Sequence, residues 1–154
     1  MSLETYDSDV LILGGGPAGL SAALYLGRAR KSVRVLDAGN PRHAVSQGVH
    51  NFLTRDGISP EDLRTIAWEQ MQAYPSVSHH PDARITNLSY EQGLWHARDA
   101  KGQTWRAKAF LLAPGIVDEH PELPGYQERW GHSIHHCPYC HGWELQDRPL
   151  AVLG

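Results

Sequence analysis

A glycine-rich loop near the start of the chain constrains its fold more than any other feature. The segment LILGGGPAGLSAA carries three glycines in the spacing G-x-G-x-x-G. An apolar run over residues 8–13 predicts a buried parallel strand before the loop, and residues 17–30 predict a helix after it. A second apolar run, residues 32–39, completes a β-α-β unit. The sequence therefore predicts an α/β fold with a parallel sheet at its centre.

The same loop predicts a place for the pyrophosphate of a dinucleotide. Gly14 permits a tight turn, Gly16 lets a phosphate approach the backbone, and Gly19 lets the helix pack closely on the strand. Free N–H groups at the helix start favour an anion. Asp37 ends the second strand, where a carboxylate can bind a ribose and disfavours a 2′-phosphate. These residues favour FAD or NAD over NADP, and the alternative is an ordinary glycine-rich turn.

The rest of the chain predicts one more helix and a set of strands. Residues 59–74 predict a helix capped by Ser59. A small antiparallel meander is expected over 83–90, 94–99 and 103–113, and a last strand over 148–154. Four histidines are expected to have no functional role, the first two in a loop: His79, His80, His96 and His120.

Composition excludes several kinds of protein. The chain has 154 residues, of which 41% are hydrophobic, and predicts one globular domain. Its net charge of −3 argues against a nucleic-acid partner. We expect no membrane segment, because the apolar runs are short, and no secretory signal in the polar, acidic N-terminal stretch. The sparse cysteines favour a reducing, cytoplasmic setting.

Both cysteines lie in HHCPYCHGWE, residues 135–144. A Cys-x-x-Cys pair in a cytoplasmic protein is either a redox dithiol or part of a zinc site. Cys137 and Cys140 would form reactive thiolates at a helix start or beside an imidazolium. The zinc alternative needs further ligands, which could come from His132, His135, His136 and His141. A purely structural disulfide is the least favoured reading, because so short a loop removes little entropy from the unfolded chain.

In order and spacing, these motifs resemble the FAD domain of the thioredoxin-reductase-like flavoproteins, a branch of the pyridine nucleotide–disulfide oxidoreductases. The matching segments are GGGPAG, HNFLTRDGISPEDL, LLAPG, CPYCHG and RPLAVLG. The resemblance implies a Rossmann-like FAD/NAD(P)-binding fold. It assigns residues 1–147 to the FAD-binding domain and residues 148–154 to the start of an NAD(P)H-binding domain, with Gly154 as the first glycine of a second fingerprint. The chain is thus expected to be the N-terminal part of a longer protein.

The resemblance also implies roles for individual residues around the cofactor FAD. The pyrophosphate would be held by Gly14, Gly16, Pro17, Ala18 and Gly19. Asp37 and Ala38 would lie at the adenosine ribose, Ile85 at the adenine, and Asn51 and Cys140 at the flavin. Arg42 stands where the family commonly has glutamine, and it could instead pair with phosphate.

The activity implied is dithiol–disulfide exchange coupled to FAD. Cys140 would face the flavin and Cys137 would exchange with substrate. His141 replaces the aspartate that usually follows the second cysteine, and it is the candidate acid–base, since histidine titrates near neutral pH. CPYCHGWE resembles a side branch that includes dithiol oxidases. Expected partners are a thioredoxin-like protein or a small dithiol, NAD(P)H for the full-length parent, and a second copy in a homodimer. Two alternatives are a zinc-binding Cys/His module and a flavoprotein with an incidental Cys-x-x-Cys.

Overall fold

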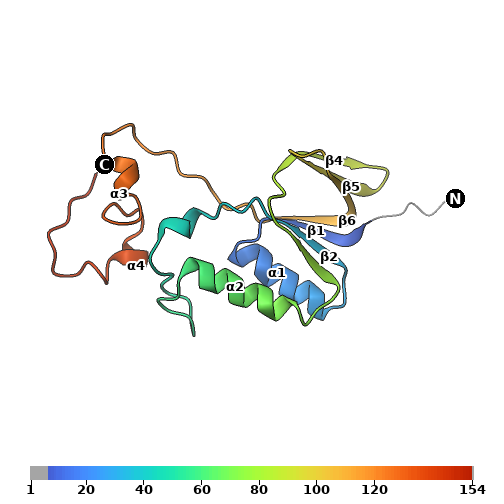
Figure 1. Ribbon diagram of the computed structural model, residues 1–154, viewed down its shortest axis with the longest axis horizontal. Helices are drawn as coiled ribbons and strands as arrows, with labels where there is room; N and C mark the ends of the chain where they lie inside the picture. Colours follow the sequence, from blue (N-terminus) through green and yellow to red (C-terminus); the bar gives the residue numbers. More distant parts are fainter. Residues whose placement is uncertain (1–6, 154) are drawn as a thin grey trace. The chain divides into compact units, whose positions relative to one another are not determined.

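The computed structural model, which describes residues 7–153, contains a six-stranded mixed sheet in the order β3-β2-β1-β6-β5-β4 (Figure 1). The four strands β3, β2, β1 and β6 run parallel to one another. Strands β5 and β4 extend the sheet beyond β6 by antiparallel pairing. The predicted α/β fold with its antiparallel meander is therefore confirmed. The strands are β1 (Ser8–Leu13), β2 (Val33–Leu36), β3 (Val77–His80), β4 (Ile85–Glu91), β5 (Leu94–Asp99) and β6 (Thr104–Leu112).

The chain divides into two compact units. The sheet unit combines the residues up to Pro41 with Arg64–Ile116, and it holds all six strands. The cysteine unit combines Arg42–Leu63 with the residues from Val117 onward. Its short helices are η1 (Arg42–Val45), α3 (Tyr126–Arg129) and α4 (Pro138–His141).

Two helices cover one face of the sheet (Figure 1). They are α1 (Pro17–Arg28) and α2 (Pro60–Met71), close to the two predicted ranges. Ser59 caps α2 as expected, since its Oγ accepts a hydrogen bond from the Asp62 N–H at 3.0 Å. Burial of apolar side chains between helices and sheet is the main force that holds them there. The buried residues of this layer are Ile12, Ala23, Val33, Val35 and Met71.

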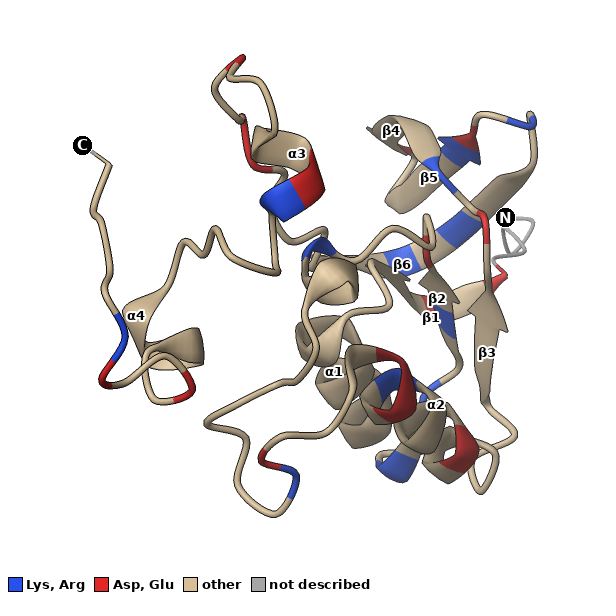
Figure 2. Cartoon of the chain, turned by 60° about the vertical axis from the view of Figure 1, so that its left-hand side comes forward, with Lys and Arg blue, Asp and Glu red and all other residues tan. Residues whose placement is uncertain are grey.

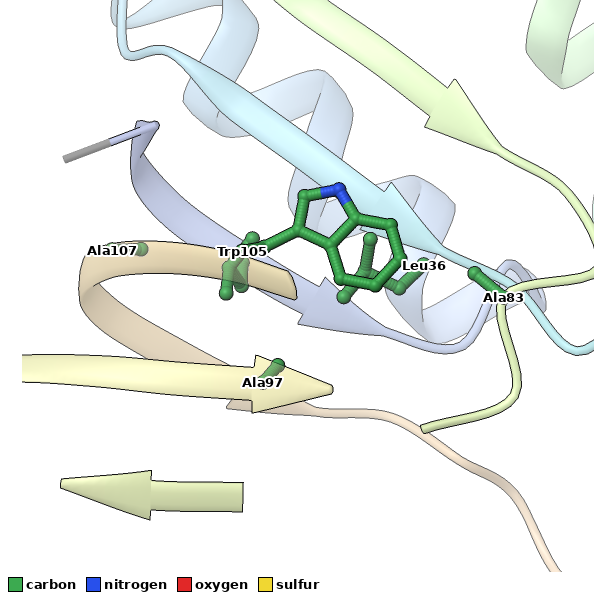
Figure 3. Packing of buried hydrophobic residues seen from close by; sticks show 6 residues of the cluster. Leu36, Ala83, Ala97, Trp105 and Ala107 are labelled. Atoms are coloured by element: carbon green, nitrogen blue, oxygen red, sulfur yellow. The ribbon is translucent and has the colours of Figure 1, made fainter. Parts of the chain in front are cut away.

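A second core lies between the parallel strands and the meander. Trp105 on β6 is its largest side chain and is only 3% exposed. Its indole lies beside Leu36 of β2, and small alanines surround it, which leaves room for the ring (Figure 3). Ile85 is packed against this cluster from the start of β4. The cluster therefore fixes the ends of β2 and β4 with respect to β1.

One sequence prediction about the histidines is wrong at the level of local structure. His79 and His80 lie on β3, which pairs in parallel with β2, and not in a loop. The pattern missed this strand because it is short and half-buried throughout. His96 lies on β5, within the predicted meander, and is half-buried, and His120 packs on Trp130 with ring centroids 4.2 Å apart.

The strand predicted over 148–154 is also wrong for its described part. Residues 148–153 pair with no strand among the described residues, and Gly154 lies outside the described range. An apolar run forms a strand only where a neighbouring strand supplies ladder hydrogen bonds.

Basic and acidic residues are intermixed on the elements that are clearly visible in Figure 2. Basic and acidic residues both occur on α2 and on the β4–β6 meander. In the described part of the chain, no helix combines the length and the apolar character needed to cross a membrane.

The Asp9 carboxylate on β1 should stabilise the fold to an extent that depends on pH. Its carboxylate accepts hydrogen bonds from the N–H and the hydroxyl of Ser32 at 3.0 and 2.9 Å, which lower its pKa from 3.8 to about 2. A depressed carboxyl pKa stabilises the fold above pH 3.8, and this stabilisation is lost as the pH falls through about 2.

We expect Asp9→Asn to lower the thermal midpoint at pH 6, at a cost of about 1 kcal/mol or less because the group is near solvent. The difference from the wild type should shrink as melting is repeated toward pH 2. A constant difference across this range would contradict the assignment.

Candidate functional site

The carboxyl ends of four parallel strands meet at one edge of the sheet and build the first part of the site. Backbone bonds fix this edge: the Gly14 N–H donates to the Leu36 carbonyl at 2.8 Å, and the Ala113 N–H donates to the Leu13 carbonyl at 2.8 Å. In open α/β sheets, ligands bind outside this end of the strands, where loops lead into helices. The glycine loop and Asp37 both lie there.

Each glycine of the loop has a different steric environment. Gly14 has φ +107°, a conformation that favours glycine, and a Cβ there would collide with the Ala113 carbonyl. A Cβ on Gly19 would collide with the Gly14 carbonyl oxygen. A Cβ on Gly16, in contrast, would meet nothing within 4 Å. Two glycines are therefore required by the turn itself, and the third faces open space.

The first turn of α1 is free to bind an anion. Gly16 is its N-cap and supplies no side-chain hydrogen bond, and Pro17 occupies the first position. Pro17 and Ala18 are exposed. The backbone N–H groups of this turn therefore have no side-chain cap, which is the arrangement that binds phosphates at helix starts.

Asp37, at the end of β2, is held ionised by its neighbours. Its Oδ2 lies 2.6 Å from Arg64 Nη2 and 3.7 Å from His79 Nε2, and its Oδ1 accepts the Gly39 N–H at 3.1 Å. The contact with His79, the Gly39 N–H and the charge of Arg64 together hold the pKa of Asp37 far below its usual range. A permanently charged acceptor at this place suits a ribose diol.

The sheet edge has three features that a dinucleotide site requires. Gly16 leaves the space that a pyrophosphate would fill, the uncapped turn supplies donors, and Asp37 supplies the acceptor. Ala38 is exposed beside Asp37. Ile85 is half-buried and packs against the core of the sheet unit. The chemistry of the glycine loop, the uncapped turn and Asp37 therefore suits the ADP part of a dinucleotide.

The two cysteines, in the cysteine unit, are joined in a disulfide, with their Cα atoms 5.3 Å apart. Cys137 is the N-cap of α4, and its Sγ accepts a hydrogen bond from the Cys140 N–H at 3.1 Å. Both residues are half-buried, whereas Tyr139 between them is 87% exposed. The turn between the two cysteines is thus open to solvent at Tyr139.

His141 follows directly on α4 and is held by two contacts. Its Nε2 lies 3.1 Å from the Ser46 hydroxyl, and its ring stacks on His135 with centroids 4.3 Å apart. Desolvation, with the nearby rings of His135 and His136, lowers the pKa of His141. The ring is therefore mostly neutral near pH 7 and can accept a proton.

The remaining predicted residues in this unit have protein partners. The Asn51 amide donates to the Tyr139 carbonyl at 2.7 Å, which connects the loop after η1 to the cysteine segment. Arg42 forms a bidentate pair with Asp118 at 2.7 and 2.5 Å. This pair raises the pKa of Arg42 and lowers that of Asp118. Arg42 could bind phosphate only by sharing or releasing Asp118.

A cavity of about 400 Å³ lies beside the cysteine segment. Its wall is polar and includes four imidazoles. Glu144 and Arg148 add one charge of each sign, and Glu144 lies 3.4 Å from His50 Nε2. The histidines that line it are His50, His132, His135 and His141. The His141 ring is thus shared between this cavity and the turn that carries the disulfide.

The zinc alternative requires two thiolates and two further ligands. Both sulfurs are already joined to each other. Among residues 7–153, no three His, Cys, Asp or Glu side chains come together in a way that could hold a metal ion. The arrangement favours the redox reading of the pair.

The structure assigns the predicted residues to two groups. The glycine loop, Asp37 and Ile85 belong to the sheet unit, whereas Arg42, Asn51 and the cysteine pair belong to the cysteine unit. Sequence reasoning missed four partners of these residues: Ser46, Arg64, His79 and Asp118. No local pattern marks them, because each partner lies tens of residues away along the chain.

Comparison with known proteins gives a consistent result. The sequence model of the family described as pyridine nucleotide-disulphide oxidoreductase matches residues 8–154. A probable thioredoxin reductase of Arthroderma benhamiae is 38% identical over 152 residues, which cover 95% of this chain and 37% of that protein. A thioredoxin reductase of Aspergillus oryzae is 40% identical, and the match covers 95% of this chain and 47% of that one. The chain thus spans less than half the length of these relatives.

Solved structures show the same fold. A putative thioredoxin reductase of Bacillus anthracis superposes with a TM-score of 0.89 at 40% identity, covering 92% of this chain and 48% of that one. An oxidoreductase of Agrobacterium tumefaciens superposes with a TM-score of 0.85 at 42% identity, covering 90% of this chain and 47% of that one.

Proposed function

Because this chain belongs to the pyridine nucleotide-disulphide oxidoreductase family, we propose that it supplies the dinucleotide site and the redox cysteines of an FAD-dependent dithiol–disulfide oxidoreductase. The observation that carries the proposal is the Cys137–Cys140 disulfide with His141 directly after it. Flavin and nicotinamide-nucleotide use are properties of the family; FAD as the particular flavin is part of the proposal.

FAD would be held by the uncapped first turn of α1 and by Asp37. Gly14, Gly16, Pro17, Ala18 and Gly19 would surround the pyrophosphate, with Asp37 and Ala38 at the ribose and Ile85 toward the adenine. Asn51 would lie near the flavin ring. Arg42 is the weakest of these assignments, since Asp118 already occupies its guanidinium. When bound, the cofactor supplies two-electron exchange with the sulfur pair.

The cysteines would act by thiol–disulfide exchange. A substrate thiolate attacks Cys137 Sγ and displaces the Cys140 thiolate, and a second thiol then releases the oxidised substrate. His141 holds or returns the proton that these steps exchange. The same steps in reverse describe disulfide reduction, so the residues serve either direction.

The proposed partners follow from this chemistry. The substrate would be a thioredoxin-like protein or a small dithiol or disulfide, and NAD(P)H would serve the longer protein as electron donor. We assign residues 1–147 to the FAD domain and the following residues to the start of a nicotinamide-nucleotide domain. We also propose that the protein forms a homodimer. A cytoplasmic location is proposed because a reactive cysteine pair is typical of a reducing compartment.

Turnover of the longer, FAD-loaded protein, which includes the nicotinamide-nucleotide domain, tests this function. Two assays are needed: NAD(P)H-dependent reduction of a thioredoxin, and oxygen-dependent closure of a small dithiol. Catalysis in either assay that requires both cysteines supports the proposal. The assay in which turnover occurs shows whether the protein reduces disulfides or oxidises dithiols. Absence of turnover in both assays, with FAD bound and the disulfide intact, would exclude it.

A further inference from the structure

We propose that Ser46 is a positioning residue that holds neutral His141 as its Nε2–H tautomer. Nδ1 of His141 then becomes the atom that takes up a proton when the cysteine pair is reduced. This inference rests on the proposed function for its chemical meaning. The arrangement itself is a property of the cysteine unit.

The Ser46 hydroxyl has a single proton to donate. Its Oγ lies 2.8 Å from the Gly48 carbonyl, which can only accept a hydrogen bond. The hydroxyl proton is therefore committed to Gly48. The same oxygen lies 3.1 Å from His141 Nε2, and with no second proton to give, it must accept there. The proton of a neutral His141 ring is therefore on Nε2.

The other ring nitrogen is left with a free lone pair. His141 Nδ1 is buried and has no hydrogen-bond partner among the described residues. The stacked His135 ring, 4.3 Å away between centroids, restricts rotation of the imidazole. Cys140 directly precedes His141 on α4, so this bare nitrogen belongs to the turn that carries the disulfide.

The charged and titratable groups around the ring favour its neutral form before reduction. His135, His136 and His50 each oppose a positive charge on His141, in addition to the desolvation that is the largest effect. Glu144 alone acts in the opposite direction. A neutral ring with Nδ1 bare is the state that can accept a proton.

The proton has a defined place in the exchange reaction. A dithiol carries two protons and gives two electrons to the Cys137–Cys140 disulfide, and a cyclic disulfide is released. One of the two substrate protons ends on the Cys137 thiol, and the other goes to His141 Nδ1. The Cys140 thiolate and the His141 imidazolium are then on consecutive residues of α4, and a neighbouring imidazolium stabilises a thiolate. Atoms, charge and electrons balance without a further reactant.

Tautomer-sensitive ¹⁵N NMR of histidine-labelled holoprotein tests the arrangement directly. In the oxidised wild type above the pKa of His141, we expect a protonated Nε2 and an unprotonated Nδ1. Ser46→Ala should allow both tautomers, and Ser46→Thr, which keeps the hydroxyl, should restore the wild-type pattern. A protonated Nδ1 in the oxidised wild type would overturn the inference.

Exchange kinetics provide the second readout. The rate at which dithiothreitol opens the disulfide, measured by alkylation and mass spectrometry, should fall about fivefold in Ser46→Ala, the factor that corresponds to one ordinary hydrogen bond. Ser46→Thr should recover most of this rate. The matched control is Ser78→Ala, which removes another serine–histidine contact of 3.1 Å, to His80, in the sheet unit. It should leave the exchange rate unchanged.

The possible failures are distinguishable. If Ser46→Ala exchanges as fast as the wild type at every pH from 6 to 9 and keeps one tautomer, Ser46 does not position the ring. If the wild type shows the expected tautomer but never turns over a dithiol or disulfide, the proposed function fails and the positioning of His141 stands.

Discussion

Replacement of either Cys137 or Cys140 by serine should reduce dithiol–disulfide turnover of the FAD-loaded protein at least about a thousandfold, because serine cannot form the disulfide that stores two electrons. The two variants should differ in one respect. Cys137→Ser keeps the sulfur assigned to the flavin side, and Cys140→Ser keeps the sulfur assigned to substrate. Only Cys140→Ser should therefore form a stable mixed disulfide with a substrate disulfide, and mass spectrometry measures that adduct.

Folding and cofactor binding control this experiment. Both variants should retain FAD and melt as a folded protein, since neither cysteine lies in the sheet unit. Tyr139→Phe is the matched control, because the side chain lies between the two cysteines and is 87% exposed. It should retain turnover. If both cysteine variants turn over normally, the Cys-x-x-Cys is incidental and the dithiol mechanism is wrong.

Replacement by alanine should have different effects at two glycines three positions apart: loss of FAD affinity at Gly16 and loss of stability at Gly19. Gly16→Ala adds a Cβ that meets nothing within 4 Å, at φ −80° and ψ −178°, which alanine adopts freely. The fold should keep its stability within about 0.5 kcal/mol. The same methyl would occupy the space in front of the uncapped turn, so FAD affinity should fall about 10- to 100-fold if the clash costs roughly 1–3 kcal/mol.

Gly19→Ala, in contrast, should lower the stability of the fold itself. Its Cβ would collide with the Gly14 carbonyl, and α1 would have to move away from β1. We expect a loss of about 1–3 kcal/mol in the free energy of unfolding. Urea unfolding measures this loss, and fluorescence quenching of added FAD measures affinity. If Gly16→Ala binds FAD as tightly as the wild type, the pyrophosphate does not rest on this turn.

The central elements of the fold could be predicted because their signals are local. The β1–loop–α1–β2 unit follows from two apolar runs and the glycine spacing between them. The cap residue Ser59 located the start of α2. The meander followed from three short strand-forming segments that lie close together in the sequence. Each of these features depends on residues a few positions apart.

Other features depend on long-range packing and could not be predicted. β3 is half-buried and shows no alternation; it is defined by its pairing with β2. The Arg64–Asp37 pair connects residues 27 positions apart, and the Ser46–His141 contact connects residues 95 positions apart. The sequence identified Asp37 and His141 but not the partners that set their charge and orientation. The chemistry of a site is thus easier to read from sequence than the contacts that position it.

The most direct test of the account is the visible spectrum of the FAD-loaded protein under anaerobic conditions. Addition of an excess of a small dithiol, enough to reduce both the disulfide and the flavin, should bleach the flavin band of the wild type, because electrons pass through the Cys137–Cys140 pair. The band of Cys140→Ser should stay unchanged under the same conditions. A wild-type protein that binds no FAD, or whose flavin band is unaffected while its disulfide is opened by the dithiol, would contradict the account.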